Sequence, residues 1–194
     1  MTVSPDRSAQ PVFGRRPFFR LQPCAPGFAA SSRFGFRNVA VFAAPCEVVF
    51  DTIADGDKEA EWFPSFQRLE WLTTAPHGEG AQRDYEIPRI RVRELFTAWK
   101  RGELLEFEFS AISLPIVTQL QERYEIAPVS SSSSRLIWQV GYEPGLLFRP
   151  VHGVLHRHFA ADFRKAVEAL GRMLGLDAPI ETENRGPRGV WAVD

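Results

Sequence analysis

Apolar and polar residues alternate along the middle of the chain with the two-residue period of strands that bury one face. The alternation is clearest at residues 103–109, where Leu105, Phe107 and Phe109 are separated by glutamates. Such a pattern predicts a half-buried strand. With turn residues between them, the segments that predict strands are residues 36–42, 67–72, 81–87, 91–99, 103–109, 117–126 and 136–142.

Three other segments predict helices. Pro45 suits a first helical turn and opens a helix over residues 46–53, and a second short helix covers residues 58–63 before Pro64. A long helix is predicted over residues 148–174. At 100° per residue its apolar side chains form one stripe, made of Val151, Leu155, Phe159, Phe163, Ala166, Leu170 and Met173.

Together these elements predict an α+β fold. Strands that follow one another along the chain form hairpins, and hairpins build an antiparallel sheet. One apolar sheet face and one amphipathic helix must then cover each other. We expect a helix-grip fold, in which a curved antiparallel sheet of about six to seven strands wraps the long C-terminal helix, with two short helices after the first strand.

The ends of the chain differ from this central region. Residues 1–34 are rich in Pro, Arg and Phe, and five prolines interrupt every candidate helix there. We expect an extension that is mobile or draped over a single domain at residues 35–176, with possible docking points at Phe13, Phe18, Phe19 and Phe28. Residues 177–194 carry two Pro, two Gly and mixed charge, and predict a C-terminal tail.

The N-terminal residues also raise the question of export. Arg15 and Arg16 precede two phenylalanines, as in a twin-arginine signal, but Arg20 and further prolines interrupt the apolar stretch that should follow. Two cysteines are too few for a disulfide scaffold and fit a reducing compartment. We therefore expect a cytoplasmic protein.

Composition narrows the classes of partner. The 194 residues include 24 aromatics and carry a net charge of −1, so the chain as a whole offers nucleic acid no electrostatic attraction. No apolar run reaches the roughly 18 residues of a membrane span. We expect a well-supplied core, no nucleic-acid partner and no membrane span, while the oligomeric state stays open.

Several residues resemble the START-like, or SRPBCC, ligand-binding superfamily, and in particular its polyketide cyclase/dehydrase-like and lipid-transport-like bacterial subgroup. The resemblance covers about residues 35–174. The matching residues are Ala44 to Phe50, Ile53 to Asp55, Trp62 to Pro64, Trp71, Gly78, Gly80, Arg83, Glu94, Trp99 to Gly102 and Trp138. The resemblance implies a cavity between sheet and helix for a hydrophobic or aromatic molecule, polyketide-like or lipid-like, without a cofactor.

A strongly curved sheet and one helix cannot pack flush everywhere, so a cavity between them is plausible on physical grounds as well. Pockets for small molecules are mostly apolar and begin near about 300 Å³, and a void below about 200 Å³ would argue against one. The residues expected to line it are Trp62, Arg83, Phe96, Phe107, Phe109, Tyr124, Trp138, His152, Phe159 and Phe163. The alternative is that these aromatic side chains simply fill the core.

Candidate acid–base groups lie on the long helix and two middle strands. His152 and His156 are four residues apart, so they share a helix face. A metal site needs a further ligand that this helix does not supply, so we expect none. Glu94 would have a raised pKa if it faces inward. Glu122 shares a strand face with Tyr124 and Ile126, which favours an inward orientation. The orientation of strand 91–99 is left undecided by its pattern, and solvated histidines and ion-paired carboxylates remain the alternative.

Three functions are therefore compatible with the sequence. The first is binding of a hydrophobic or aromatic small molecule. The second is an enzyme of the cyclase or dehydratase type, with His152 or His156 and Glu94 or Glu122 as acid and base. The third is a non-catalytic interaction module that uses the basic and aromatic residues 1–37 to contact a partner protein.

Overall fold

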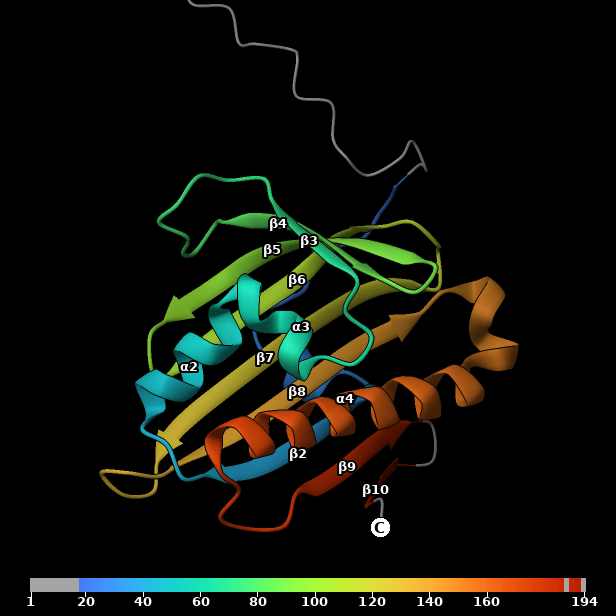
Figure 1. Ribbon diagram of the computed structural model, residues 1–194. Coiled ribbons are helices and arrows are strands. Elements are labelled where there is room, and N and C mark those ends of the chain that lie inside the picture. Colours follow the sequence, from blue (N-terminus) through green and yellow to red (C-terminus); the bar gives the residue numbers. More distant parts are fainter. Residues whose placement is uncertain (1–17, 187–188, 193–194) are drawn as a thin grey trace, which may run out of the picture.

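The computed structural model describes residues 18–186 and 189–192 of the chain. Within them ten strands form one antiparallel sheet in the order β10-β9-β2-β8-β7-β6-β5-β4-β3, with β1 paired to β6 (Figure 1). The strands are β1 (Phe19–Arg20), β2 (Phe34–Phe42), β3 (Arg68–Trp71), β4 (Gln82–Ile87), β5 (Ile90–Lys100), β6 (Leu104–Ile112), β7 (Val117–Pro128), β8 (Ser134–Pro144), β9 (Glu181–Gly186) and β10 (Gly189–Ala192).

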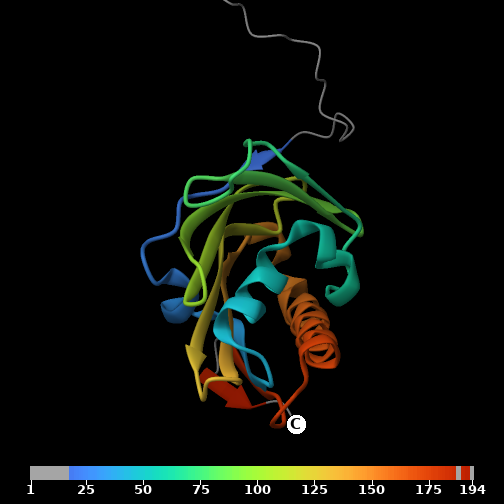
Figure 2. The ribbon, with the colours of Figure 1, turned by 60° about the vertical axis from the view of Figure 1, so that its left-hand side comes forward.

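The helices lie against the concave face of this sheet, which curves around them (Figure 2). They are α2 (Cys46–Ala54), the 3-10 turn η1 (Gly56–Lys58), α3 (Glu59–Trp62), the 3-10 turn η2 (Leu146–Val151) and α4 (His152–Leu174). A further short helix, α1 (Phe28–Ser31), lies on the convex side. The predicted α+β helix-grip fold is thus confirmed, with more strands than the six or seven expected.

The long helix begins later than predicted, because Pro150 lies in η2 and regular α-helix starts at His152. Its buried face also differs from the predicted stripe. Met173 is exposed, whereas small residues at the C-terminal half, including Ala166, allow close packing on the sheet. The buried positions of α4 are His156, Ala160, Phe163, Ala166, Val167, Ala169, Leu170 and Gly171. No helix in the described part of the chain is both long enough and apolar enough to cross a bilayer.

The predicted C-terminal tail is wrong for residues 181–186, which form strand β9 and pair with β2. The segment contains no large apolar residue, so its pattern carried no strand signal; backbone pairing with the otherwise open edge of β2 holds it. Its inward side chains are buried and polar. Thr182 Oγ1 donates a 2.8 Å hydrogen bond to Asn38 Oδ1, and Asn184 reaches helix α4.

Residues 18–33, here called the N-terminal arm, lie on the convex face of the sheet. Strand β1 pairs with β6, and the following backbone bridges β6 and β7 through Leu21 N to Ser110 O at 3.0 Å and Gln22 N to Thr118 O at 3.0 Å. In α1, Ala29 is fully buried and its amide donates to Gln121 Oε1 at 2.8 Å. The arm therefore completes the sheet where β6 and β7 diverge.

The proposed aromatic docking points contribute unequally to this arm. The Phe18 ring lies under the guanidinium groups of Arg91 and Arg93, at 5.1 and 5.2 Å, whereas Phe19 is 44% exposed. Phe13 lies outside the described residues, as do Arg15 and Arg16.

Candidate functional site: a cavity between the sheet and helix α4

A cavity lies between the concave sheet face and the N-terminal half of α4. Its wall is mainly aromatic and aliphatic, with polar groups from both the sheet and the helices. The lining residues are Phe36, Glu59, Phe63, Tyr85, Ile87, Ile90, Val92, Glu94, Phe107, Phe109, Ile112, Ile116, Val117, Leu120, Glu122, Tyr124, Val140, Tyr142, Pro144, Phe148, His152, Leu155, His156, Phe159 and Phe163.

The position of the cavity follows from how α4 packs. In its C-terminal half Ala166, Val167 and Leu170 are fully buried against the sheet, so no space remains there. Strand β5 carries register shifts between Arg93 and Glu94 and between Phe96 and Ala98. Such bulges bend a strand and increase its twist. The sheet thus curves away from the first turns of α4, and the cavity occupies that gap.

The cavity is small. Its volume is about 100 Å³, below the minimum of about 200 Å³ expected of a ligand pocket, so in its present shape the cavity fails that test. A void of about 150 Å³ takes up one benzene ring. The cavity as it stands therefore has room for a molecule of a few non-hydrogen atoms, and a larger ligand needs the wall to move. Several lining side chains are only partly buried, including Ile90, Ile116, Phe148 and Leu155, so this part of the wall faces solvent.

Most of the residues expected at the site do meet there. The cavity is lined by Phe107, Phe109, Tyr124, His152, Phe159 and Phe163, and by the acid–base candidates His156, Glu94 and Glu122. The structure places Trp62, Arg83, Phe96 and Trp138 outside the lining set, although they are buried close behind it. The undecided orientation of β5 is settled, because Val92, Glu94 and Phe96 are all buried on the concave side.

Behind one wall lies a fully buried ion-pair triad of Glu59, Arg83 and Glu94. Arg83 donates from Nη1 to Glu59 Oε2 at 2.9 Å and from Nη2 to Glu59 Oε1 at 3.4 Å, and its Nε donates to Glu94 Oε2. The guanidinium also lies 5.2 Å from the ring centre of Phe96 and 5.7 Å from that of Phe107, a cation–π arrangement. These contacts hold the positive charge in the core.

Burial and pairing compete in setting the pKa values of the triad. Burial raises the pKa of Glu59 to about 7, against the lowering effect of Arg83. Burial also raises the pKa of Glu94, again opposed by Arg83. For Arg83, burial alone would lower the pKa, but the two carboxylates raise it above its usual value. The arginine stays charged, and burial holds the pKa of each partner carboxyl above its ordinary value.

Glu122 on β7 is a separate buried carboxyl, and no cationic side chain of the described residues is paired with it. Its Oε2 accepts hydrogen bonds from Trp138 Nε1 at 3.0 Å and from the Tyr124 hydroxyl at 3.1 Å. Burial, together with the nearby Glu94, raises the pKa of Glu122 to about 8 despite these two donors. Glu122 is therefore mostly a neutral carboxylic acid at pH 7.

On the helix side, four groups form a hydrogen-bonded chain. The Tyr142 hydroxyl lies 2.6 Å from His152 Nε2 and 2.8 Å from His156 Nδ1, and His156 Nε2 lies 3.0 Å from Asn184 Oδ1. If Asn184 Oδ1 accepts, His156 carries its proton on Nε2 and accepts from Tyr142 at Nδ1, so His152 Nε2 must donate to Tyr142. Burial lowers the pKa of both histidines, which favours these neutral forms.

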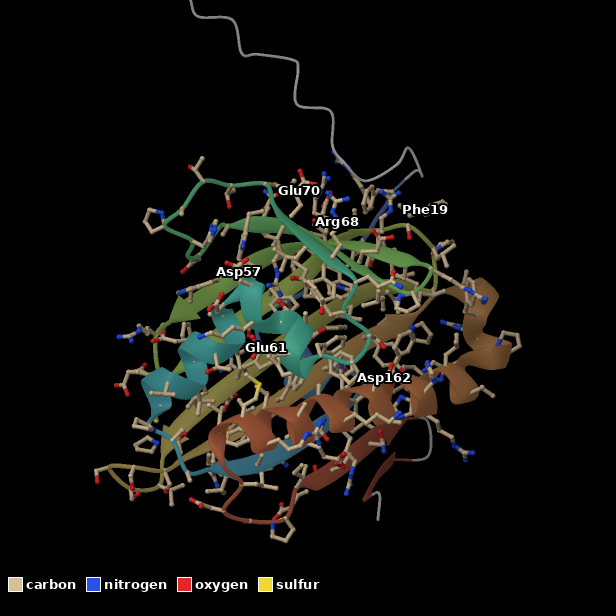
Figure 3. The ribbon with its side chains drawn as sticks, in the orientation of Figure 1. Phe19, Asp57, Glu61, Arg68, Glu70 and Asp162 are labelled. Atoms are coloured by element: carbon tan, nitrogen blue, oxygen red, sulfur yellow. The ribbon has the colours of Figure 1, made fainter. Side chains whose placement is uncertain are left out.

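Four polar residues of the site escaped sequence reasoning. Tyr85 shares the inward face with Arg83, a signal that the alternation of β4 could have supplied. Glu59 sits in a short polar segment where the flanking Asp57 and Glu61, labelled in Figure 3, are exposed and Glu59 alone faces inward. Tyr142 belonged to a predicted strand face, but its partners were unknown. Asn184 had no signal, because its strand was not predicted. In the described ranges, no three His, Cys, Asp or Glu side chains are grouped so as to hold a metal ion.

Comparison with known proteins gives relatives for most of this domain. Uncharacterized proteins of Mycobacterium tuberculosis and Mycobacterium bovis are 25% identical over 160 residues, which covers 77% of this chain and 95% of theirs. A START superfamily protein from Mycobacterium smegmatis superposes with a TM-score of 0.60 at 15% identity, covering 72% of this chain and 98% of its own. An aromatase/cyclase from Streptomyces sp. R1128 superposes with a TM-score of 0.54 at 17% identity, over 73% and 96%.

These structural likenesses, all at low identity, establish a shared fold. The family assignment has a separate basis in the sequence. The family model described as polyketide cyclase / dehydrase and lipid transport matches residues 33–175, which comprise the sheet from β2 to β8 and the helices α2 to α4. The chain belongs to the polyketide cyclase / dehydrase and lipid transport family.

Proposed function

We propose that the chain binds a hydrophobic or aromatic small molecule, polyketide-like or lipid-like, in the cavity between the sheet and α4. The observation that carries this proposal is the cavity itself, with aromatic and aliphatic walls and a few buried polar groups. That combination is what small-molecule sites generally present, an apolar wall with polar groups that fix orientation. Membership of a family with cyclases and lipid transporters supports it.

The small volume restricts how such a ligand is held. A short apolar segment fits the cavity as it stands, and one ring fits once the wall has moved. The remainder of a longer ligand extends past the partly buried side chains of Ile90, Ile116 and Phe148. These belong to the β4–β5 hairpin, the β6–β7 connection and η2, all of which are connecting or terminal segments. Such segments are generally more mobile than the elements that they join, so ligand entry requires movement there.

Native mass spectrometry of freshly purified protein tests the proposal by detecting a co-purified small molecule. Val117 lines the cavity, so Val117→Trp should block it and remove the bound mass. Val129 is 59% exposed and lies outside the lining set, so Val129→Trp is the matched control and should retain it. If wild type carries no molecule and takes up no apolar probe, or if both variants behave alike, the proposal fails.

A second candidate function is an enzyme of the cyclase or dehydratase type. The observation that favours it is that the Tyr142–His152–His156 chain and the carboxyl of Glu122 line the same cavity. A half-buried histidine whose proton position is set by a neighbour is suited to transfer a proton near pH 7.

Substitution separates catalysis from binding in this second candidate. His152→Ala should abolish turnover of a polyketone substrate while leaving its affinity within a few-fold. His158 is exposed on the same helix and outside the lining set, so His158→Ala is the matched control. Equal turnover in the two variants would exclude His152 as acid or base.

A further inference from the structure

Two polar groups on the sheet side of the cavity have hydrogen-bonding capacity that the protein does not use. The first is the Tyr85 hydroxyl on β4. Tyr85 is 6% exposed and lines the cavity, and its hydroxyl has no hydrogen-bond partner among the described residues. It lies near the Glu59 carboxylate without reaching hydrogen-bonding geometry. A buried hydroxyl without a hydrogen-bond partner destabilises the fold. A hydroxyl in this state at a cavity wall therefore indicates that a ligand atom accepts its hydrogen bond.

The second group is the Glu122 carboxyl on β7. Both of its donors, Trp138 Nε1 and the Tyr124 hydroxyl, bind the same oxygen, Oε2. An oxygen that accepts two hydrogen bonds behaves as the carbonyl oxygen of the acid, so the acidic proton of the neutral group lies on Oε1. In the described part of the chain no acceptor is paired with Oε1, and Glu122 lines the cavity.

The charge state of Glu122 follows from its surroundings. A buried carboxylate without a cation is strongly disfavoured, and the nearby cation, Arg83, is bound to Glu59 and Glu94 instead. The titratable and charged groups that face this region of the core are Glu59 on α3, Arg83 and Tyr85 on β4, Glu94 on β5, Tyr124 on β7, Tyr142 on β8, and His152 and His156 on α4. The two histidines are neutral and Arg83 is matched by its own partners, so none of these groups supplies a free positive charge for Glu122.

We propose that the Tyr85 hydroxyl and the neutral Glu122 carboxyl act together as hydrogen-bond donors to one acceptor oxygen of the ligand, so that the cavity selects a carbonyl compound. This inference rests on the proposed binding function and specifies the ligand's chemistry. Paired phenol and carboxylic acid donors in an apolar site suit a ketone oxygen, or the enolate formed from it. The same arrangement disfavours an amine, because a cation finds donors rather than acceptors and no unpaired carboxylate.

Three compact probes of equal heavy-atom count test the inference: cyclopentanone, methylenecyclopentane and cyclopentylamine. Affinities are measured by protein-observed NMR titration for wild type, Tyr85→Phe and Glu122→Gln. Tyr85→Phe removes one donor and should weaken cyclopentanone about five- to tenfold while changing methylenecyclopentane less than about twofold. The carbonyl stretch of bound cyclopentanone should lie at lower wavenumber in wild type than in Tyr85→Phe.

A pH profile tests the contribution of the Glu122 donor separately. Because the pKa of Glu122 is raised to about 8, the donor is present below that pH and lost above it. Cyclopentanone affinity should therefore fall between about pH 7 and about pH 9.5 in wild type, while methylenecyclopentane affinity stays constant. In Glu122→Gln the amide oxygen still accepts from Trp138 and Tyr124 and the NH2 group still donates, so the ketone should bind within about threefold of wild type with no fall in this range.

The outcomes separate this inference from the function on which it rests. If no probe binds, and wild type carries no co-purified molecule, the binding function itself fails. If methylenecyclopentane binds and Tyr85→Phe weakens both neutral probes equally, the cavity binds apolar molecules but the donor pair is wrong. Preferential binding of cyclopentylamine would also overturn the inference, because it would require an ionised acceptor at Glu122.

Discussion

Replacing Arg83 by methionine should destabilise the fold by an amount that depends on pH. The side chains of Arg83, Glu59 and Glu94 are 4%, 6% and 4% exposed, so the variant leaves two carboxyls buried without a cation. Removing one partner from a buried ion pair costs about 3–5 kcal/mol. We expect that loss near pH 8, where both carboxyls would be ionised in the unfolded chain.

Acid should restore most of this stability. In wild type the pKa of Glu59 is raised to about 7, from 4.5 in the unfolded chain, so its contribution is greatest below pH 4.5 and is lost as pH rises toward 7. Without Arg83 the pKa of Glu59 and Glu94 rises further, so in the variant the loss continues to higher pH. Near pH 5 Glu59 is mostly neutral in wild type, and without Arg83 burial favours the neutral form of both carboxyls. The difference should therefore shrink to about 1–2 kcal/mol, the scale of lost hydrogen bonds.

Urea unfolding followed by tryptophan fluorescence measures both effects. Arg101 is paired with Asp51 at an exposed site, so Arg101→Met is the matched control and should show no comparable change in its effect between pH 5 and pH 8. Combining Arg83→Met with Glu59→Gln and Glu94→Gln should recover stability near pH 8, because no unpaired charge remains. An Arg83→Met penalty that is the same at both pH values, or below about 1 kcal/mol at pH 8, would refute the reasoning.

Three further predictions concern the helix side and the two ends of the chain. Nitrogen-15 NMR should find His152 and His156 neutral at pH 7 with the proton on Nε2, and titrating below the ordinary pKa of 6.5; a charged ring at pH 7 would contradict the hydrogen-bonded chain. Gly141→Val should release the N-terminal arm, because a Cβ at this position meets Ser32 Oγ at 2.5 Å, and limited proteolysis of the arm should accelerate while cavity binding persists. Thr182→Val should cost about 1–2 kcal/mol in urea unfolding because it leaves a buried amide oxygen without its donor; an unchanged midpoint would mean that β9 adds no stability there.

Much of the fold was accessible from the sequence because its strands bury one face. The seven predicted strands correspond to β2–β8, within a few residues at each end. In β6, Leu105 and Phe107 are 2% and 3% exposed, as alternation required. Where side chains on both faces are partly apolar, as in β5, the pattern could not choose a face. The bulge between Arg93 and Glu94, which depends on pairing with β6, helps to set the orientation.

The elements that were missed are held by backbone pairing and by polar contacts between distant segments. Strand β9 has no apolar face, and its strand geometry comes from pairing with β2. The two strands are far apart in the sequence: Arg37 and Glu183, which pair across them, are separated by 146 positions. The same holds for the site. Glu122 was expected inward from its spacing with Tyr124, but its neutral state depends on burial and on Arg83 being paired with Glu59 and Glu94 instead. Such partner choices are made in three dimensions and leave no period in the sequence.

The cost of these buried groups is itself an argument for binding. A core optimised for stability alone would satisfy the Tyr85 hydroxyl and replace Glu122 by an apolar side chain of similar volume, since uncompensated buried polar groups destabilise a fold. Both groups instead line the cavity. A ligand that accepts their hydrogen bonds would remove that cost only in the folded state, and so would stabilise it by about 2.7 kcal/mol at a hundredfold excess over Kd. The rise in melting temperature should therefore be larger for a carbonyl probe than for its hydrocarbon analogue, and the excess should shrink in Tyr85→Phe, where Glu122 is the only donor left of the proposed pair.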